Sequence, residues 1–327
     1  MARHPGSSPI FALLLACTLA PTAKACDFCL ISQGISPLET LSGSGLRITQ
    51  RYSLNDELFH GTDEINNPGA SERFFTTDFS AFYGVEQIPG LLLTANLPVR
   101  STRQWGEAKL NDATGDIDFE NVSGSSGGIG DISLLARYTF FTQHTLDTSF
   151  LLAATVGVKL PTGGTDGRTT AGDEFLDAHV QAGTGSTDAL LGLSANLAHA
   201  RLGLSANMLS GITGEGEVGD TDHSFGDWLN YDVTGRYRVW PSEIGAGGNS
   251  VFLSLGMNGE WRGHETQDGA EVDDSGGHTV YIAPGLQINF AEHWVAEFSY
   301  QRAVYHDLNS VQLGENYKVF GSITYSF

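Results

Sequence analysis

Two cysteines three positions apart, Cys26 and Cys29 in the stretch C-D-F-C-L, have a spacing that metal sites, haem attachment and redox disulfides all use. Covalent haem attachment requires a histidine directly after the second cysteine, and Leu30 stands there. A zinc site would need two more ligands, and the chain has no second cysteine pair. Three interpretations stay open: a local disulfide, a thiolate contact to a metal or redox partner, and lipidation of Cys26. No resident cofactor is predicted.

The residues before this pair resemble a secretion signal. Arg3 and His4 precede a short apolar run over 10–20, and Ala23-Lys24-Ala25 is a small-x-small cleavage site. The apolar run is too short to span a bilayer. We therefore predict a signal peptide over 1–25. Lipoprotein processing at Cys17 is a weaker alternative, because Leu15 is a poor fit directly before the small Ala16.

Charge excludes one class of partner. The chain carries 17 Lys and Arg against 38 Asp and Glu, a net charge of −21. Nucleic-acid binding depends on Lys and Arg that neutralise phosphates, so a nucleic-acid partner is not expected. After the signal there is no apolar run of about 18 residues, the length of a transmembrane helix.

Alternation with a period of two recurs along the chain and predicts strands. In 73–86, for example, Phe75, Phe79 and Tyr83 share one face, whereas Thr76 and Asp78 share the other. Twelve such runs occur, at roughly 45–54, 73–86, 91–100, 131–141, 148–160, 186–197, 201–211, 227–240, 250–262, 279–290, 293–302 and 317–327.

Short and long connections alternate between these runs, with the long ones at about 55–72, 101–130, 161–185, 212–226, 263–278 and 303–316. An even strand number with short turns at one end and long loops at the other is typical of an outer-membrane β-barrel. We predict an all-β, transmembrane antiparallel barrel of 12 strands over 45–327, with short periplasmic turns and long acidic extracellular loops. A soluble β-sandwich also alternates, but gives no reason for long loops at one end.

The charged residues of the strands fall mainly on one face. In 227–240, Asp232, Arg236 and Arg238 share a face, and Tyr237 and Val239 hold the other. Because a charge facing lipid is costly, this face is expected to line the lumen. The candidate lumen residues are Asp78, Glu86, Arg100, Arg137, Lys159, Asp232, Arg236, Arg238, Glu260, Arg262 and Glu297.

The six long loops hold 25 of the 38 acids and only three bases. Such loops could concentrate cations at the mouth or bind divalent ions through oxygen ligands. The weak metal candidates are Asp220 and Asp222 in G-D-T-D-H, and Asp273 and Asp274 in E-V-D-D. The simpler interpretation is that the acids keep the extracellular end soluble and are bridged by divalent cations among anionic lipids.

Three stretches carry a family resemblance: GIGDISLLARYTFF (128–141), GVKLPTGG (157–164) and GTGSTDALLGLSANLAHARLGLSANML (183–209). They resemble the outer-membrane barrel transporters associated with the MetA pathway of phenol degradation. The resemblance implies a channel or transport role in the Gram-negative outer membrane and supplies no ligand residues. The last strand, ending in Phe327, is similar to the signal that barrel-assembly machinery recognises.

The predicted function is passage of a small solute through a polar, mixed-charge lumen, with outer-membrane lipid as the surroundings. The alternative is a scaffold whose N-terminal segment, 26–44, docks a periplasmic redox or metal-handling partner. A minor alternative is an outer-membrane hydrolase, for which the only conceivable groups are His223 with Ser224, or His264, Asp273, Asp274 and His278. Catalytic residues are not predicted.

The periplasm is oxidising, so a Cys26–Cys29 disulfide is permitted there. Intact-mass spectrometry of the mature protein should then show a mass about 2 Da below that of the dithiol, restored by reductant. A mass increase from a lipid, or an unchanged dithiol mass, would contradict the disulfide.

Overall fold

The computed structural model describes residues 43–110, 114, 116–172, 174–242, 249–291 and 293–327. The predicted signal peptide and the Cys26–Cys29 pair lie outside these residues. No helix in the described ranges is long and apolar enough to cross a membrane.

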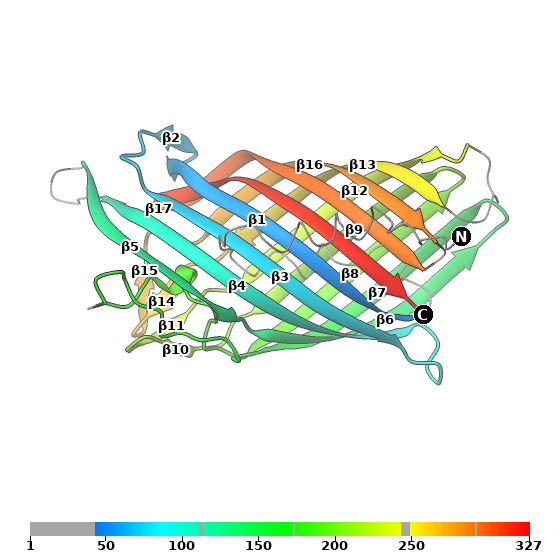
Figure 1. Cartoon of the computed structure of the whole chain (residues 1–327), viewed down its shortest axis with the longest axis horizontal. Helices are drawn as coiled ribbons and strands as arrows, with labels where there is room; N and C mark the ends of the chain where they lie inside the picture. The colour runs from blue at the N-terminus through cyan, green and yellow to red at the C-terminus, as the bar shows by residue number, and fades with distance from the viewer. Residues whose placement is uncertain (1–42, 111–113, 115, 173, 243–248, 292) are drawn as a thin grey trace, which may run out of the picture.

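The described chain closes into an antiparallel barrel (Figure 1). Neighbours in the sheet follow one another along the chain, and β1 pairs with β17 to close the ring. Among the described residues eleven labelled strands form the ring: β1 (Ser44–Gly61), β3 (Ser71–Gly84), β4 (Leu91–Leu110), β6 (Ile132–His144), β7 (Thr148–Leu160), β8 (Asp188–His199), β9 (Leu202–Ile212), β12 (Trp228–Trp240), β13 (Ser250–Arg262), β16 (Gly277–Phe290) and β17 (Trp294–Ser326).

The last strand, β17, crosses the barrel twice. Its first part pairs with β16 up to Leu308, and its second part, from Val311 to Ser326, pairs with β1. Since both pairings are antiparallel, the chain reverses near Ser310, which has a positive φ of 53°. The ring therefore has twelve crossings within the described residues, as the sequence predicted, and the predicted long loop at 303–316 is wrong. A tight hairpin stands there instead.

The strands are strongly tilted. Following hydrogen-bonded partners once around the ring from Gly45 of β1 leads back to β1 at Gly61, sixteen residues further along (61 − 45). A shift of this size over twelve strands corresponds to a tilt of roughly 40°, within the usual range for barrels. β4 has 20 residues and β7 has 13, so the wall is taller at β4 than at β7.

Several predicted loops contain further strands at the extracellular end. β2 (Asp63–Ile65) pairs with β1, and β5 (Ile117–Ile129) pairs with the upper half of β4, so most of the predicted loop 101–130 is sheet. The two loops after β9 and β13 form a small sheet of β10 (Gly216–Val218), β11 (Thr221–Ser224), β14 (Glu265–Gln267) and β15 (Ala270–Val272). The chain between β7 and β8 contains a 3₁₀ turn, η3 (Ala178–Val180).

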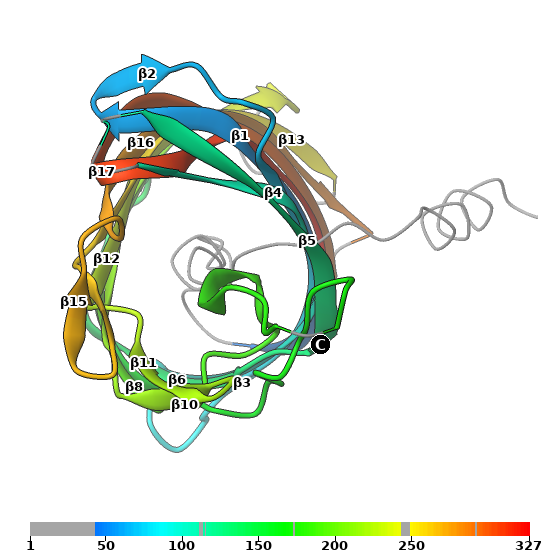
Figure 2. The same cartoon turned by 90° about the vertical axis from the view of Figure 1, so that its left-hand side faces the viewer.

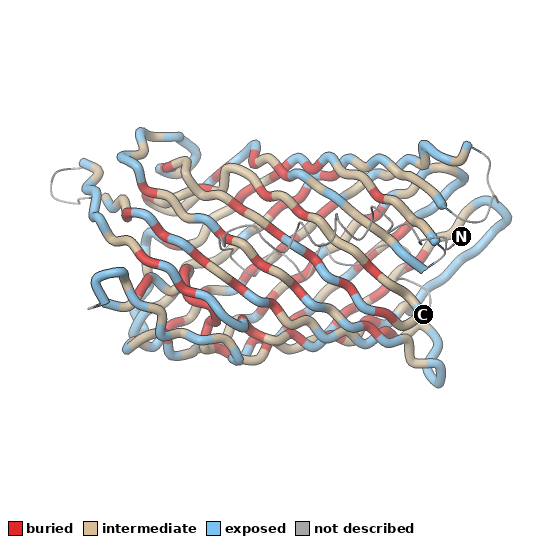
Figure 3. Tube along the Cα trace, viewed as in Figure 1, coloured by how far each residue is buried: buried red, intermediate tan, exposed pale blue. Residues whose placement is uncertain are grey.

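Burial alternates along the strands in step with the predicted faces (Figure 3). In β3, Thr76 and Asp78 are buried, whereas Phe79 and Tyr83 are exposed on the outer surface. Large apolar side chains such as Leu255, 62% exposed, cover the outside. An apolar exterior with a polar interior is the arrangement that a bilayer requires of a barrel.

Aromatic side chains gather at the end with short turns. Trp294 packs on Tyr325 with ring centroids 4.8 Å apart, and Tyr325 contacts Phe327 at 6.2 Å. Trp261, 47% exposed, lies toward the other end. Rings at both ends of the apolar surface are typical of the two membrane interfaces.

Replacing Leu255 by arginine should destabilise the inserted barrel by about 2–4 kcal/mol, because the guanidinium would face hydrocarbon. Urea unfolding in phospholipid vesicles measures this. Leu146→Arg is the matched control, since Leu146 stands fully exposed in the turn between β6 and β7 and should tolerate the charge. Equal stability of the two variants would contradict the assigned outer face.

Candidate functional site in the barrel lumen

The membrane-embedded half of the barrel encloses a cavity of about 190 Å³, here called the lower cavity. Polar side chains from most strands line it, as alternation predicts. Its lining also includes apolar side chains at inward-facing strand positions, where alternation alone predicts polar residues. These side chains are Phe82, Leu92, Leu135, Leu190, Trp228 and Phe320. The lower cavity thus offers apolar walls together with hydrogen-bonding groups.

Charges in the lower cavity are largely compensated by neighbours. Arg47 Nη2 lies 2.7 Å from Glu297 Oε2, joining β1 to β17. Asn207 Nδ2 donates to both carboxylate oxygens of Asp232 at 3.0 and 3.2 Å. Arg137 donates to Ser194 Oγ. Because buried charges are costly unless they are paired, these contacts stabilise a filled, mixed-charge interior.

The segment between β7 and β8, residues 161–187, folds into the barrel and is called the inward loop. Figure 2 shows this green segment, with η3, inside the ring of strands. Its stem is closed by two glycines: a Cβ on Gly163 would lie 2.5 Å from the Cα of Gly183, and Gly183 N–H donates to the carbonyl of Gly164 at 2.9 Å. Only glycine permits this approach of the two chains.

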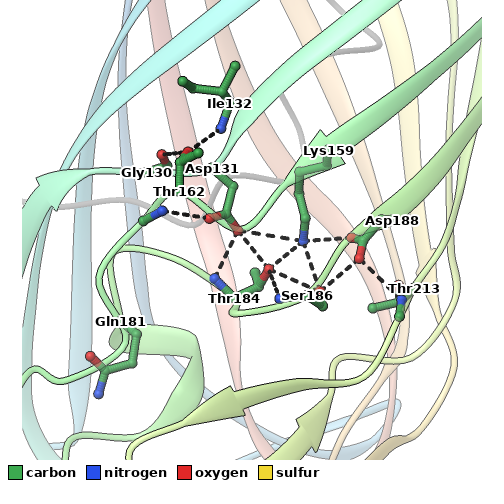
Figure 4. A network of polar contacts seen from close by, with 12 residues as sticks. Gly130, Asp131, Ile132, Lys159, Thr162, Gln181, Thr184, Ser186, Asp188 and Thr213 are labelled. Atoms are coloured by element: carbon green, nitrogen blue, oxygen red, sulfur yellow. Dashed lines mark hydrogen bonds and ion pairs between the residues drawn. The ribbon is translucent and has the colours of Figure 1, made fainter.

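A buried ionic network holds the base of the inward loop (Figure 4). Lys159 Nζ at the end of β7 lies 2.6 Å from Asp188 Oδ2 at the start of β8 and 3.6 Å from Asp131 Oδ2. Thr184 and Ser186 of the loop accept hydrogen bonds from the same ammonium. All these side chains are less than 9% exposed.

Asp131 reaches the network because the strand is irregular before β6. β4 pairs with β5 up to Ile129 and with β6 from Ser133, which leaves Gly130 and Asp131 between the two ladders. Asp131 accepts from the N–H groups of Gly163 and Thr184, both at 2.9 Å. One carboxylate therefore binds both ends of the inward loop.

Arg100 of β4 fixes the far part of the loop. Its Nη1 donates to the carbonyl oxygens of Gln181 and Ala182 at 3.0 and 3.1 Å. Gln181, fully buried, in turn bonds the backbone of Gly167 and Leu176. The loop is thus a folded part of the interior, which corrects its prediction as an extracellular loop.

Above the inward loop lies a second cavity of about 490 Å³, the upper cavity. Trp228 lines both cavities, and Gly211 leaves room for its ring, since a Cβ there would lie 2.2 Å from it. On the strand side, Lys318 is fully buried with its Nζ 2.7 Å from both Glu260 and Glu315. This contact ties β17 to β13.

Glu265 of β14 connects the inward loop to the extracellular sheet. Its carboxylate lies 3.0 Å from His223 Nε2 and 3.4 Å from His179 Nε2, which belongs to η3. Burial alone would raise the pKa of Glu265, but His179, His223 and Arg262 together lower it below its ordinary value. The ionised carboxylate therefore acts as a bridge between loop and sheet.

The structure brings most of the sequence-predicted lumen residues into the two cavities. Asp78, Arg137, Lys159, Asp232, Arg236 and Glu297 line the lower cavity, and Glu260 and Arg262 line the upper one. Arg100 is buried against the inward loop. One expectation needs correction: Glu86 is exposed in the turn after β3. Arg238 stacks on Phe252 near the periplasmic end, outside these two cavities.

The weak metal and hydrolase candidates do not form the expected arrangements. Within the described ranges no group of three or more His, Cys, Asp or Glu could hold a metal, which includes Asp220, Asp222, Asp273 and Asp274. Each candidate histidine has a structural contact: His223 with Glu265, His264 Nδ1 with the carbonyl of Val272, and His278 with Tyr231 Oη.

Sequence reasoning missed the inward loop and the apolar lining. For the lining, a signal existed: Phe82 and Phe320 interrupt otherwise polar faces. For the loop, the neighbouring glycines and the small polar residues of G-T-G-S-T-D were visible, but they fit an exposed turn as well.

A closed antiparallel barrel with an apolar exterior and a charged interior defines a β-barrel protein of the outer membrane, as the sequence predicted. The family model described as "Putative MetA-pathway of phenol degradation" matches residues 70–316. The chain belongs to this family, as the sequence motifs indicated.

One solved structure shares this fold. The COG4313 outer membrane channel from Pseudomonas putida F1 has 16% sequence identity and a TM-score of 0.66, covering 90% of this chain and all of its own. The beta domain of the Bordetella autotransporter BrkA (12% identity, TM-score 0.45) covers 88% of this chain and 100% of that chain. The CymD monoaromatic hydrocarbon channel (13% identity, TM-score 0.39) covers 88% and 89%. The last two scores are too low to carry an argument. No curated protein matches the sequence.

Lys159→Met should destabilise the barrel by about 3–5 kcal/mol, because it leaves the buried Asp131 and Asp188 without their cation. Urea unfolding in vesicles measures the loss. Lys109→Met, which breaks an exposed 2.9 Å pair with Glu107, is the control and should cost less than about 1 kcal/mol. Similar losses for both variants would show that the network does not hold the structure.

Proposed function

We propose that this protein is an outer-membrane channel for small solutes that combine an apolar body with a polar group. The observation that carries the proposal is the lower cavity, where Phe82, Leu92 and Trp228 face the lumen among paired charges. Inward aromatic side chains are not required in a pore for hydrophilic solutes. A cavity is not required in an interior that only seals the barrel.

The family description and the first structural neighbour support the same role. The family is described through phenol degradation, and phenol is a small ring with one hydroxyl. The neighbour from Pseudomonas putida is itself described as an outer membrane channel. For this chain, a solute of similar chemistry would contact the apolar walls and hydrogen-bond to Ser, Thr and Asn side chains.

The inward loop would control passage. It lies between the two cavities and is fixed by Arg100, Lys159 and Asp131. A path through the barrel must pass beside the loop, so the intact protein should conduct ions weakly.

Deleting residues 164–182 and joining Gly163 directly to Gly183 tests this role. The two glycines already touch, and Lys159, Thr184 and Asp188 remain in place, so the barrel should fold. In planar bilayers the variant should show a conductance several-fold above that of the wild type. Shortening the β14–β15 hairpin by removing residues 268 and 269 is the control and should leave conductance near the wild-type value.

A lumen that stays sealed in both the wild type and the loop deletion would contradict the channel. Together with co-purification of a periplasmic metalloprotein, that result would favour the scaffold that docks a partner through residues 26–44. Uptake of phenol into vesicles containing the protein tests the solute class, and equal uptake of glycerol would contradict the need for an apolar body.

A further inference from the structure

Three oxygen-bearing side chains stand side by side in the wall of the upper cavity, at the extracellular ends of β1, β3 and β4. In the strand register Asn55 is opposite Glu72, and Glu72 is opposite Gln104. Directly opposed residues have Cβ atoms about 4.5–5.5 Å apart. All three residues line the same cavity, so their side chains converge on one space.

These side chains have more acceptors than donors. Gln104 is 3% exposed, and among the residues that the structure describes its Oε1 has no hydrogen-bond partner; the same holds for the buried Oδ1 of Asn55. The contact of Asn55 Nδ2 with Glu72 Oε2, at 3.4 Å, is long. Burying an acceptor without a partner is unfavourable, so two such acceptors beside a carboxylate point to a positively charged ligand.

Further negative charge surrounds the cluster. Glu107 of β4 and Asp177, which caps η3 of the inward loop, line the same cavity. Lys109 pairs with Glu107 and is half exposed.

We propose that Asn55, Glu72 and Gln104 form a binding site for a calcium ion in the upper cavity. Calcium takes six to eight oxygen ligands at variable geometry, and carboxylates, amide carbonyls and waters all serve. Magnesium requires a near-ideal octahedron and keeps its waters, so it fits this site less well. With a single carboxylate in direct contact, the affinity belongs to the range of extracellular sites, about 10⁻⁴–10⁻³ M.

The site goes beyond the proposed transport of a solute, because calcium binding would be coupled to the position of the inward loop. Asp177 accepts a hydrogen bond from His179 N–H at the start of η3 and lines the same cavity as the three strand residues. Calcium at the wall would neutralise the repulsion between Asp177, Glu107 and Glu72 and draw the loop toward β3 and β4.

Isothermal titration of the refolded mature protein with calcium chloride, in detergent and free of lipopolysaccharide, tests the site. The wild type should bind one ion saturably. Glu72→Gln should weaken binding by about tenfold or more, and Gln104→Leu, which removes no charge, should weaken it several-fold.

Asp63→Asn is the matched control, because it removes one carboxylate from the exposed loop segment β2 outside the cavity. Its calcium affinity should equal that of the wild type. Absence of saturable binding up to about 10 mM calcium would overturn the site. Equal weakening by Asp63→Asn and Glu72→Gln would also overturn it, since diffuse attraction to the acidic loops would then explain the binding. Heat-modifiable gel mobility verifies that each variant is folded, and conductance of the loop deletion tests the channel separately.

Discussion

The pairing of β1 with β17 is the constraint on which the rest of the structure depends. In hydrocarbon no water is present to bond backbone N–H and C=O groups, so a sheet survives there only when it has no free edge. The first and last strands therefore have to meet, and their register, from Gly45 opposite Ser326 to Gly61 opposite Leu308, sets the tilt of the other strands. The strand tilt and the number of strands together set the width of the lumen.

Closure also explains the distribution of charge. Every second residue of a strand faces lipid, where charge is costly, and the others face a narrow interior. Arg47, Lys159 and Lys318 therefore lie inside, each within 2.7 Å of a carboxylate from another strand. Two of these pairs, Arg47–Glu297 and Lys318–Glu260, link strands that are distant in sequence, and the third joins the neighbouring strands β7 and β8. Paired charges therefore hold the interior together around its cavities.

The inward loop divides that interior into two environments. Below it, aromatic and aliphatic side chains meet compensated charges, which suits a small amphipathic solute. Above it, carboxylates outnumber basic groups, which suits a cation. Asp131 and Arg100 hold the loop from the strand side, and His179 with Glu265 holds it from the extracellular sheet. The position of the inward loop therefore determines how the two cavities are connected.

The sequence by itself determined the barrel, its twelve crossings and the inward face of most strands, because alternation is a local property that lipid and lumen impose on every strand. It placed Asp78, Asp232 and Glu297 inward for the same reason. It could not determine the position of Glu86, because alternation has no meaning beyond the end of a strand. Only the tertiary structure decided that residues 161–187 turn inward, since Lys159, Asp131 and Asp188 come from three segments that the pairing of β6, β7 and β8 brings together. The juxtaposition of Asn55, Glu72 and Gln104 likewise depends on strand register, which sequence periodicity does not specify.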